Sequence, residues 1–258
     1  MTFIVRRPGA KLAPFVESLW YATAELAHGR ERVLPSGTAQ LLVNLHEDEL
    51  RWYDERVNRI AGAGFMGAHD RPFAIDTREQ RAILGVSFRA AGAFPFFDPR
   101  ETSGLHVALE DLWGKEGRVL RERLLEERTP VAMLAMVEGV LLERAKRLTI
   151  DPAIAFAVGA LEEGARVGAV VDHLGMTPRR FIRAFEERVG LAPKRFARVR
   201  RFQRVLAADR AFDWAAIAAE VGYSDQAHLI HEFALFAGET PTSYRPRADA
   251  SNHVPLRG

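Results

Sequence analysis

The chain has 258 residues, 48% hydrophobic and 27% charged, which is enough apolar material for sizeable cores and a length typical of two domains. It contains no cysteine, which excludes disulfides, thiolate metal ligands and cysteine nucleophiles. No segment has the apolar length of a secretory signal or a membrane span, so we expect a cytoplasmic protein with no membrane partner.

The first third of the chain has the pattern of short strands separated by turns. Residues 32–45 begin with a Pro-Ser-Gly turn and continue as an apolar strand, and residues 81–90 form a second candidate for a buried strand. Glycines in residues 62–75 allow bends or bulges. This pattern predicts a β-rich barrel or sandwich.

From about Leu109 to Arg147, apolar residues recur three and four positions apart, which predicts two helices flanking the β-rich part. Thr129 and Pro130 have the residue types that cap and start the second helix. We therefore predict an N-terminal domain over residues 1–147. The second helix carries an apolar stripe that suits either packing on its own domain or self-association: Val131, Leu134, Val137 and Leu141.

Positive charge is concentrated in one part of the chain. The segment from His173 to Arg210 has eleven basic and three acidic residues, although the whole chain has a net charge of only +2. Such asymmetry indicates a polyanionic partner, with a solvated helical surface as the alternative. Arginine predominates, and its guanidinium group binds phosphate in a bidentate manner. The candidates for phosphate contacts are Arg180, Arg195, Arg198, Arg200, Arg201 and Arg204.

The helical C-terminal part contains an internal repeat with an offset of 48 residues. Matched pairs at one offset predict the same supersecondary unit twice. The pairs are Phe181 and Leu229, Phe185 and Phe233, Gly190 and Gly238, Pro193 and Pro241, and Phe196 and Tyr244.

Each repeat has the pattern of a helix-turn-helix unit: a short amphipathic helix, a turn with glycine and a second helix. The units cover about residues 165–190 and 213–238 of a predicted all-helical domain, residues 148–250. The apolar pairs four residues apart should pack inward, so that intervening residues face the DNA major groove. The residues expected to face outward are Arg179, Arg180, Ile182 and Arg183 in the first unit, and Gln226, Ala227, His228, Ile230, His231 and Glu232 in the second.

The segment from about Asp151 to Arg247 resembles the AraC family of bacterial transcription regulators. The resemblance is carried by "TPRRFIRAFEERVGLAPKRF", "RFARVRRFQRVLAAD" and "IAAEVGYSDQAHLIHEFALFAGETPTSYR". It implies a sequence-specific transcription factor whose two units, joined by a rigid helix, read successive major grooves of double-stranded DNA. It places base-reading roles on Arg179, Ile182, Arg183, Gln226, Ala227, His228 and His231, although the family often has arginine at the last position.

The N-terminal part resembles the regulatory domain of one AraC subgroup, through stretches such as "LPSGTAQLLVNL" and "GAHDRPFAI". The resemblance makes a small-molecule effector, RNA polymerase and a second copy of the chain candidate partners. The side chains that we consider for an effector pocket are Trp20, Trp52, Phe65 and Arg89, with core packing as the alternative.

We expect no enzyme activity, cofactor or metal site, because no carboxylate pair, nucleophile triad or phosphate loop is recognisable. The spacing of His46, His69 and His106 matches no ligand motif, so core or surface positions are favoured. Two alternatives stay open. The β-rich domain is an enzyme or small-molecule carrier that the helical domain targets to DNA, or it only dimerises.

Overall fold

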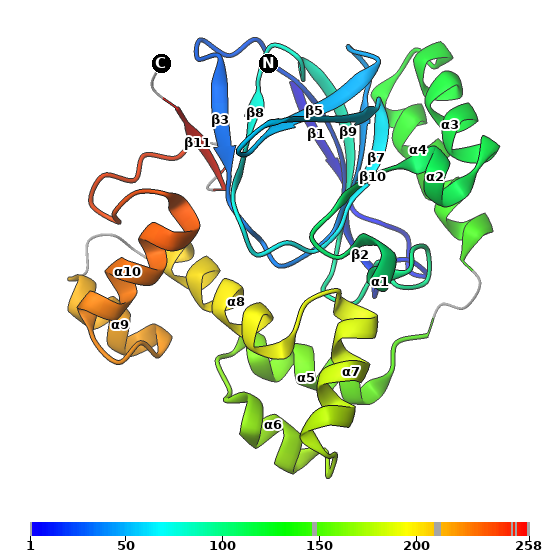
Figure 1. Cartoon of the computed structure of the whole chain (residues 1–258). Helices are drawn as coiled ribbons and strands as arrows, with labels where there is room; N and C mark the ends of the chain where they lie inside the picture. The colour runs from blue at the N-terminus through cyan, green and yellow to red at the C-terminus, as the bar shows by residue number, and fades with distance from the viewer. Residues whose placement is uncertain (1, 146–148, 209–212, 249, 251, 257–258) are drawn as a thin grey trace.

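A β-rich N-terminal domain lies against a helical C-terminal domain in the computed structural model (Figure 1). The structure describes residues 2–145, 149–208, 213–248, 250 and 252–256. The predicted domain boundary, between residues 147 and 148, lies outside these ranges. None of the helices in the described ranges combines the length and apolar character needed to cross a membrane.

Two antiparallel sheets build the N-terminal domain and curve around a shared interior (Figure 1). The six-stranded sheet has the order β1-β2-β9-β4-β7-β10 and the bounds Thr2–Arg6 (β1), Val16–Thr23 (β2), Ala82–Phe88 (β9), Gln40–Asn44 (β4), Ala63–Met66 (β7) and His106–Ala108 (β10). The five-stranded sheet has the order β11-β3-β8-β5-β6 and the bounds His253–Pro255 (β11), Arg30–Val33 (β3), Phe73–Asp76 (β8), Glu49–Tyr53 (β5) and Val57–Ala61 (β6). The predicted β-rich architecture is confirmed.

The six-stranded sheet presents two apolar faces because successive side chains of a strand point to opposite sides. On β4, Leu41 and Val43 are buried in the core beneath the helices, whereas Gln40 and Leu42 line the space between the sheets. Side chains of the neighbouring strand β9 alternate in the same way between the core and the space between the sheets. The sheet therefore separates a solid core from an interior that side chains do not fill.

Three helices pack on the outer face of the six-stranded sheet: Leu109–Trp113 (α2), Lys115–Glu126 (α3) and Pro130–Arg144 (α4). The short helix Pro99–Thr102 (α1) precedes them and contacts the C-terminal domain. Leu134, Val137 and Leu141 of α4 are buried in the core shared with β4 and β9. The apolar stripe on α4 thus packs on its own domain, except for Val131, which is 62% exposed.

The C-terminal domain consists of two helical units joined by a long helix, α8 (Figure 1). The helices are Pro152–Glu162 (α5), Val167–His173 (α6), Pro178–Val189 (α7), Pro193–Ala207 (α8), Trp214–Val221 (α9) and Gln226–Ala237 (α10). The matched residues of the repeat occupy equivalent structural positions in both units. Phe181 and Leu229 are buried in separate cores, and Gly190 and Gly238 both end their helices in the left-handed conformation, which suits glycine.

Candidate nucleic-acid interface and ligand cavity

The second helix of the first unit, α7, presents an exposed arginine-rich face. Thr177 caps it by accepting a hydrogen bond from the backbone N–H of Arg180, and Pro178 occupies its first turn. Burial of the phenylalanines four residues apart turns Arg179, Ile182 and Arg183 outward. The side chain of Arg183 is 81% exposed, and its Nε donates to Glu187 over 3.0 Å.

The second helix of the second unit, α10, has the same arrangement with different side chains. Asp225 caps it by accepting from the backbone N–H of His228 over 2.7 Å. Leu229 and Phe233 are buried, and four of the residues expected to face outward are exposed: Gln226, Ala227, His228 and His231. Both helices therefore offer polar side chains near their N-termini, where a helix in the major groove would meet base edges.

Glu232 does not face outward, and that expectation is wrong. Its side chain is only 4% exposed, because position 232 follows Leu229 by three residues and so lies beside it on the inner face of α10. One carboxylate oxygen accepts from Arg198 Nε over 2.7 Å, and the other lies 2.9 Å from Arg201 Nη2. Burial alone would raise the pKa of Glu232, but hydrogen bonds from these arginines outweigh it and lower the pKa.

Five of the six arginines expected to contact phosphate have partners inside the protein. Besides the two arginines on Glu232, Arg200 pairs with Glu162 over 3.2 Å, and Arg204 donates to the backbone carbonyl of Val221 over 2.8 Å. Arg180 is exposed, and the largely exposed Arg195 lies 3.5 Å from Asp70. Contact of any of the six with DNA stays a prediction.

A cavity of about 480 Å³ lies between the two sheets of the N-terminal domain. Two of the four residues considered for an effector pocket, Trp20 and Trp52, line it. Phe65 instead stacks on Phe97 in the core, with ring centroids 3.9 Å apart. Arg89 is exposed and its Nε donates to the backbone carbonyl of Ala13 over 3.0 Å. The structure therefore does not bring Phe65 and Arg89 to this cavity.

Two histidines stand in an aromatic cluster on the cavity wall. The ring of His106 stacks on Trp52 with centroids 4.1 Å apart, and the ring of Phe73 contacts both His106 and His69. Burial lowers the pKa of His69 to about 4 and that of His106 to about 3. No group of three or more metal-binding side chains occurs among the described residues. The burial of His69 and His106 cannot be predicted from their spacing in the sequence, so the spacing alone did not place the two rings at a cavity.

Stability should fall between about pH 7.5 and about pH 5, and His69→Leu should remove about 2 kcal/mol of that fall. The folded-state pKa of His69 is about 4 against an ordinary value of 6.5, so in this window the unfolded chain binds the extra proton. Protons thus favour unfolding as the pH drops below 6.5 toward 4, and the full stability is present above 6.5. Urea unfolding across this range measures the effect.

Phe73→Leu is the matched control, because Phe73 contacts both histidine rings but does not titrate. It should change the absolute stability and leave the pH slope intact. A slope that is unchanged in His69→Leu would show that the folded protein accommodates the charged ring.

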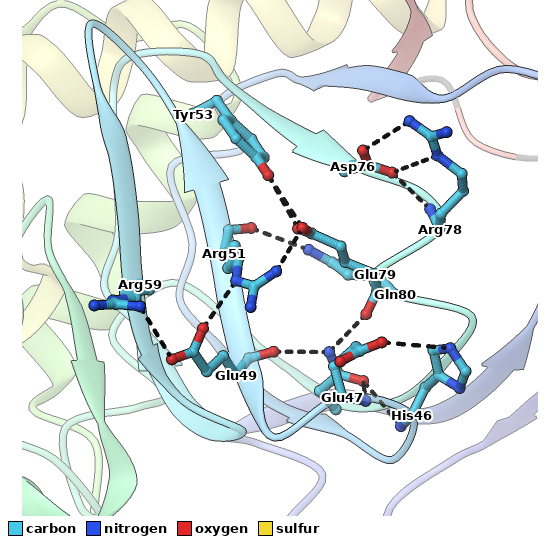
Figure 2. A network of polar contacts seen from close by, with 11 residues as sticks. His46, Glu47, Glu49, Arg51, Tyr53, Arg59, Asp76, Arg78, Glu79 and Gln80 are labelled. Carbon is cyan, nitrogen blue, oxygen red and sulfur yellow. Dashed lines mark hydrogen bonds and ion pairs between the residues drawn. The ribbon is translucent and has the colours of Figure 1, made fainter.

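The charged side chains of the cavity wall are already paired. Figure 2 shows the guanidinium of Arg51 between two carboxylates, with Glu49 at 2.8 Å and Glu79 at 2.7 Å. The hydroxyl of Tyr53 also donates to Glu79. Arg51 lines the cavity but directs its charge into this network.

Part of the cavity wall comes from the C-terminal end of the described chain. Strand β11 pairs antiparallel with β3, and Arg247, Asn252 and His253 line the cavity. Buried Glu31 on β3 accepts from His253 Nδ1 over 2.9 Å and lies 3.3 Å from Arg247 Nη1. Burial alone would raise the pKa of Glu31, but hydrogen bonds from His253 and His28 and the charge of Arg247 lower it.

Two family models match separate parts of the chain. A family model described as "Helix-turn-helix domain" matches residues 170–247. A model described as "Domain of unknown function (DUF6597)" matches residues 5–105. No curated protein matches the chain.

Solved structures give distant matches. ToxT from Vibrio cholerae is 9% identical over 94% of this chain and 97% of its own, with a TM-score of 0.46. A second ToxT structure from the same organism, bound to an unsaturated fatty acid, is 8% identical over 93% of each chain, with a TM-score of 0.46. The xylose-binding transcription activator XylR is 18% identical over 50% of this chain and 37% of its own, with a TM-score of 0.31. These likenesses are too distant to assign a ligand.

Proposed function

We propose that this chain, a DNA-binding transcription regulator of the AraC type, reads two successive major grooves with α7 and α10 under the control of a small molecule in its N-terminal cavity. The observation that carries the proposal is the structural repeat. Both helices have a capped N-terminus, a buried apolar pair and exposed polar side chains, and α8 holds them at its two ends (Figure 1). DNA is the polyanion that suits this arrangement.

The base-reading roles follow from side-chain chemistry at the exposed positions. Arg179 and Arg183 suit guanine, Gln226 suits adenine, and Ile182 and Ala227 suit a thymine methyl group. His228 and His231 supply further polar contacts on α10. For the phosphates, Arg180 and Arg195 are the best placed, because both are largely exposed and Arg195 is 3.5 Å from its partner Asp70. The other four arginines would have to exchange closer internal partners.

Selection from a random duplex library, followed by titration of the selected site at two salt concentrations, tests the proposal. We expect a motif with two elements about one helical turn apart, roughly 34 Å, and an affinity that falls steeply with salt. Salt-dependent binding without sequence preference would contradict base reading and leave only an electrostatic surface.

Arg183→Ala should relax specificity at particular bases of the first element, by about 1–3 kcal/mol of discrimination. Among the described residues, the one ion-pair partner of the exposed guanidinium of Arg183 is Glu187, and a weak surface pair of this kind can be exchanged for a base. Affinity for the selected site and for single-base variants measures the change.

Arg123→Ala is the control for Arg183→Ala, since it removes the same charge from the exposed face of α3 in the other domain. Specificity should be unaffected in this variant. If Arg183→Ala lowered the affinity for all DNA sequences equally, Arg183 would contribute to binding through its charge and not through base reading.

The route from cavity to DNA that we propose passes through the chain end and β3. Gln203 of α8 donates to the side chain of Asn252 over 3.0 Å and to the carbonyl of Pro35 over 2.7 Å. Arg32 of β3 donates to the carbonyl of Ala237 at the end of α10 over 2.7 Å. A ligand that moves the cavity wall would thereby shift the second unit.

The cytoplasm is the proposed place of action, with RNA polymerase and a second copy of the chain as further proposed partners.

A further inference from the structure

The cavity between the sheets has the size and lining of a site for a small organic molecule. Its volume of about 480 Å³ falls within the range of ligand pockets in proteins. Aromatic rings contribute from both sheets, with Trp20 on β2, Trp52 on β5 and Phe73 on β8. Aliphatic side chains fill in between them: Leu42, Leu50, Ile75 and Ile83. A planar apolar body would bury most of its surface here.

His69 is the buried polar side chain of this wall that has no hydrogen-bond partner in the described part of the chain. The residue is 7% exposed, and neither ring nitrogen has a hydrogen-bond partner among the described residues. A buried polar group without a partner costs free energy that a bound ligand would recover. A neutral imidazole has one N–H donor and one acceptor nitrogen. It can therefore hydrogen-bond with a ligand group that donates, that accepts, or that does both.

The electrostatics of the wall disfavour a charged ligand. The charged side chains among the described lining residues are Glu31, Arg51 and Arg247, and each has an ion-pair partner. A carboxylate ligand would have to displace Glu79 from Arg51 or Glu31 from Arg247. Burial also keeps His69 neutral at physiological pH, because its pKa is lowered to about 4. A buried charge without a counterion is unfavourable.

We propose that this cavity binds a neutral aromatic molecule with one hydroxyl or N–H group, whose ring packs among Trp20, Trp52 and Phe73 and whose polar group hydrogen-bonds with His69. This inference deepens the proposed function, because it rests on the cavity as the effector site and names the class of effector. His69 selects the polar group and the aromatic wall selects the ring.

Binding to the full chain, in the absence of DNA, tests the ligand class. The probes are phenol and indole as neutral aromatics with a donor, toluene as an aromatic without one, cyclohexanol as a non-aromatic alcohol and benzoate as an aromatic anion. Phenol and indole should raise the melting temperature in a concentration-dependent way and change the tryptophan fluorescence, since Trp20 and Trp52 line the cavity. Benzoate and cyclohexanol should act at least about tenfold more weakly.

The variant His69→Leu keeps the site apolar and removes the hydrogen-bonding ring. It should weaken phenol about tenfold, which corresponds to the loss of one hydrogen bond, and leave toluene unchanged or stronger. His46→Leu is the matched control, because His46 is exposed on the turn before β5, outside the cavity lining. It should leave both affinities unchanged.

Three results would overturn the proposal: benzoate binding as tightly as phenol, phenol binding equally to the His69→Leu variant, or no binding of any probe to the folded chain. None of these bears on sequence-specific DNA binding. The duplex selection tests the proposed function separately, so failure of the ligand class and failure of the regulator hypothesis are distinguishable.

Discussion

Replacing Glu232 with alanine should lower the free energy of unfolding by about 3–5 kcal/mol, the cost of removing one member of a buried ion pair. The carboxylate of Glu232 is the shared acceptor for Arg198 and Arg201, and it fastens α10 to α8. Without it, two guanidinium groups face the inner side of α10 with no acid between them. Urea unfolding of the full chain measures the loss.

The same variant should also lose the contribution of the second unit to DNA binding, because α10 would no longer be held at a fixed angle to α8. Footprinting on the selected site should show protection of the first element only. Glu187→Ala is the control: it removes a glutamate from the surface pair with Arg183 and should cost less than about 1 kcal/mol. Full stability of Glu232→Ala would mean that the arginines find solvent or new partners.

The helix-turn-helix units were predictable because their signals are local. Phe181 and Phe185 lie four residues apart, as do Leu229 and Phe233, and this spacing fixes which face of each helix is buried. The orientation of Glu232 was not predictable in the same way. A glutamate in a helix is normally solvated, and its two arginine partners lie more than 30 residues away in sequence.

In the N-terminal domain, too, local sequence patterns predicted some features, whereas others depend on residues far apart in the sequence. Short apolar runs separated by turn residues predicted the strands, and aromatic character pointed to Trp20 and Trp52, which line the cavity. Phe65 has the same character but points to the opposite face of its sheet, which only the register decides. Nothing local marks His253–Pro255 as a strand, because its partner β3 lies more than 200 residues earlier.

Glu31→Ala should lower the free energy of unfolding by about 3–5 kcal/mol and release the C-terminal strand from β3. Glu31 is 1% exposed and accepts from His28, Arg247 and His253, so its removal leaves three donors without this acid, two of which, Arg247 and His253, line the cavity. Hydrogen exchange at the backbone amides of His253 and Val254 should rise to the rate of an open chain end, since β3 is the one partner of β11 among the described strands.

Glu25→Ala is the matched control, because this glutamate pairs with Arg81 on the surface of the same domain and its side chain is 81% exposed. It should cost less than about 1 kcal/mol and leave exchange at β11 unchanged. If the C-terminal strand transmits the state of the cavity, Glu31→Ala should also change the affinity for the second DNA element, through the loss of the Asn252 contact with Gln203. Released β11 with unchanged DNA affinity would remove the chain end from the proposed route. It would leave two connections of that route, the bond of Arg32 to the end of α10 and the bond of Gln203 to the carbonyl of Pro35.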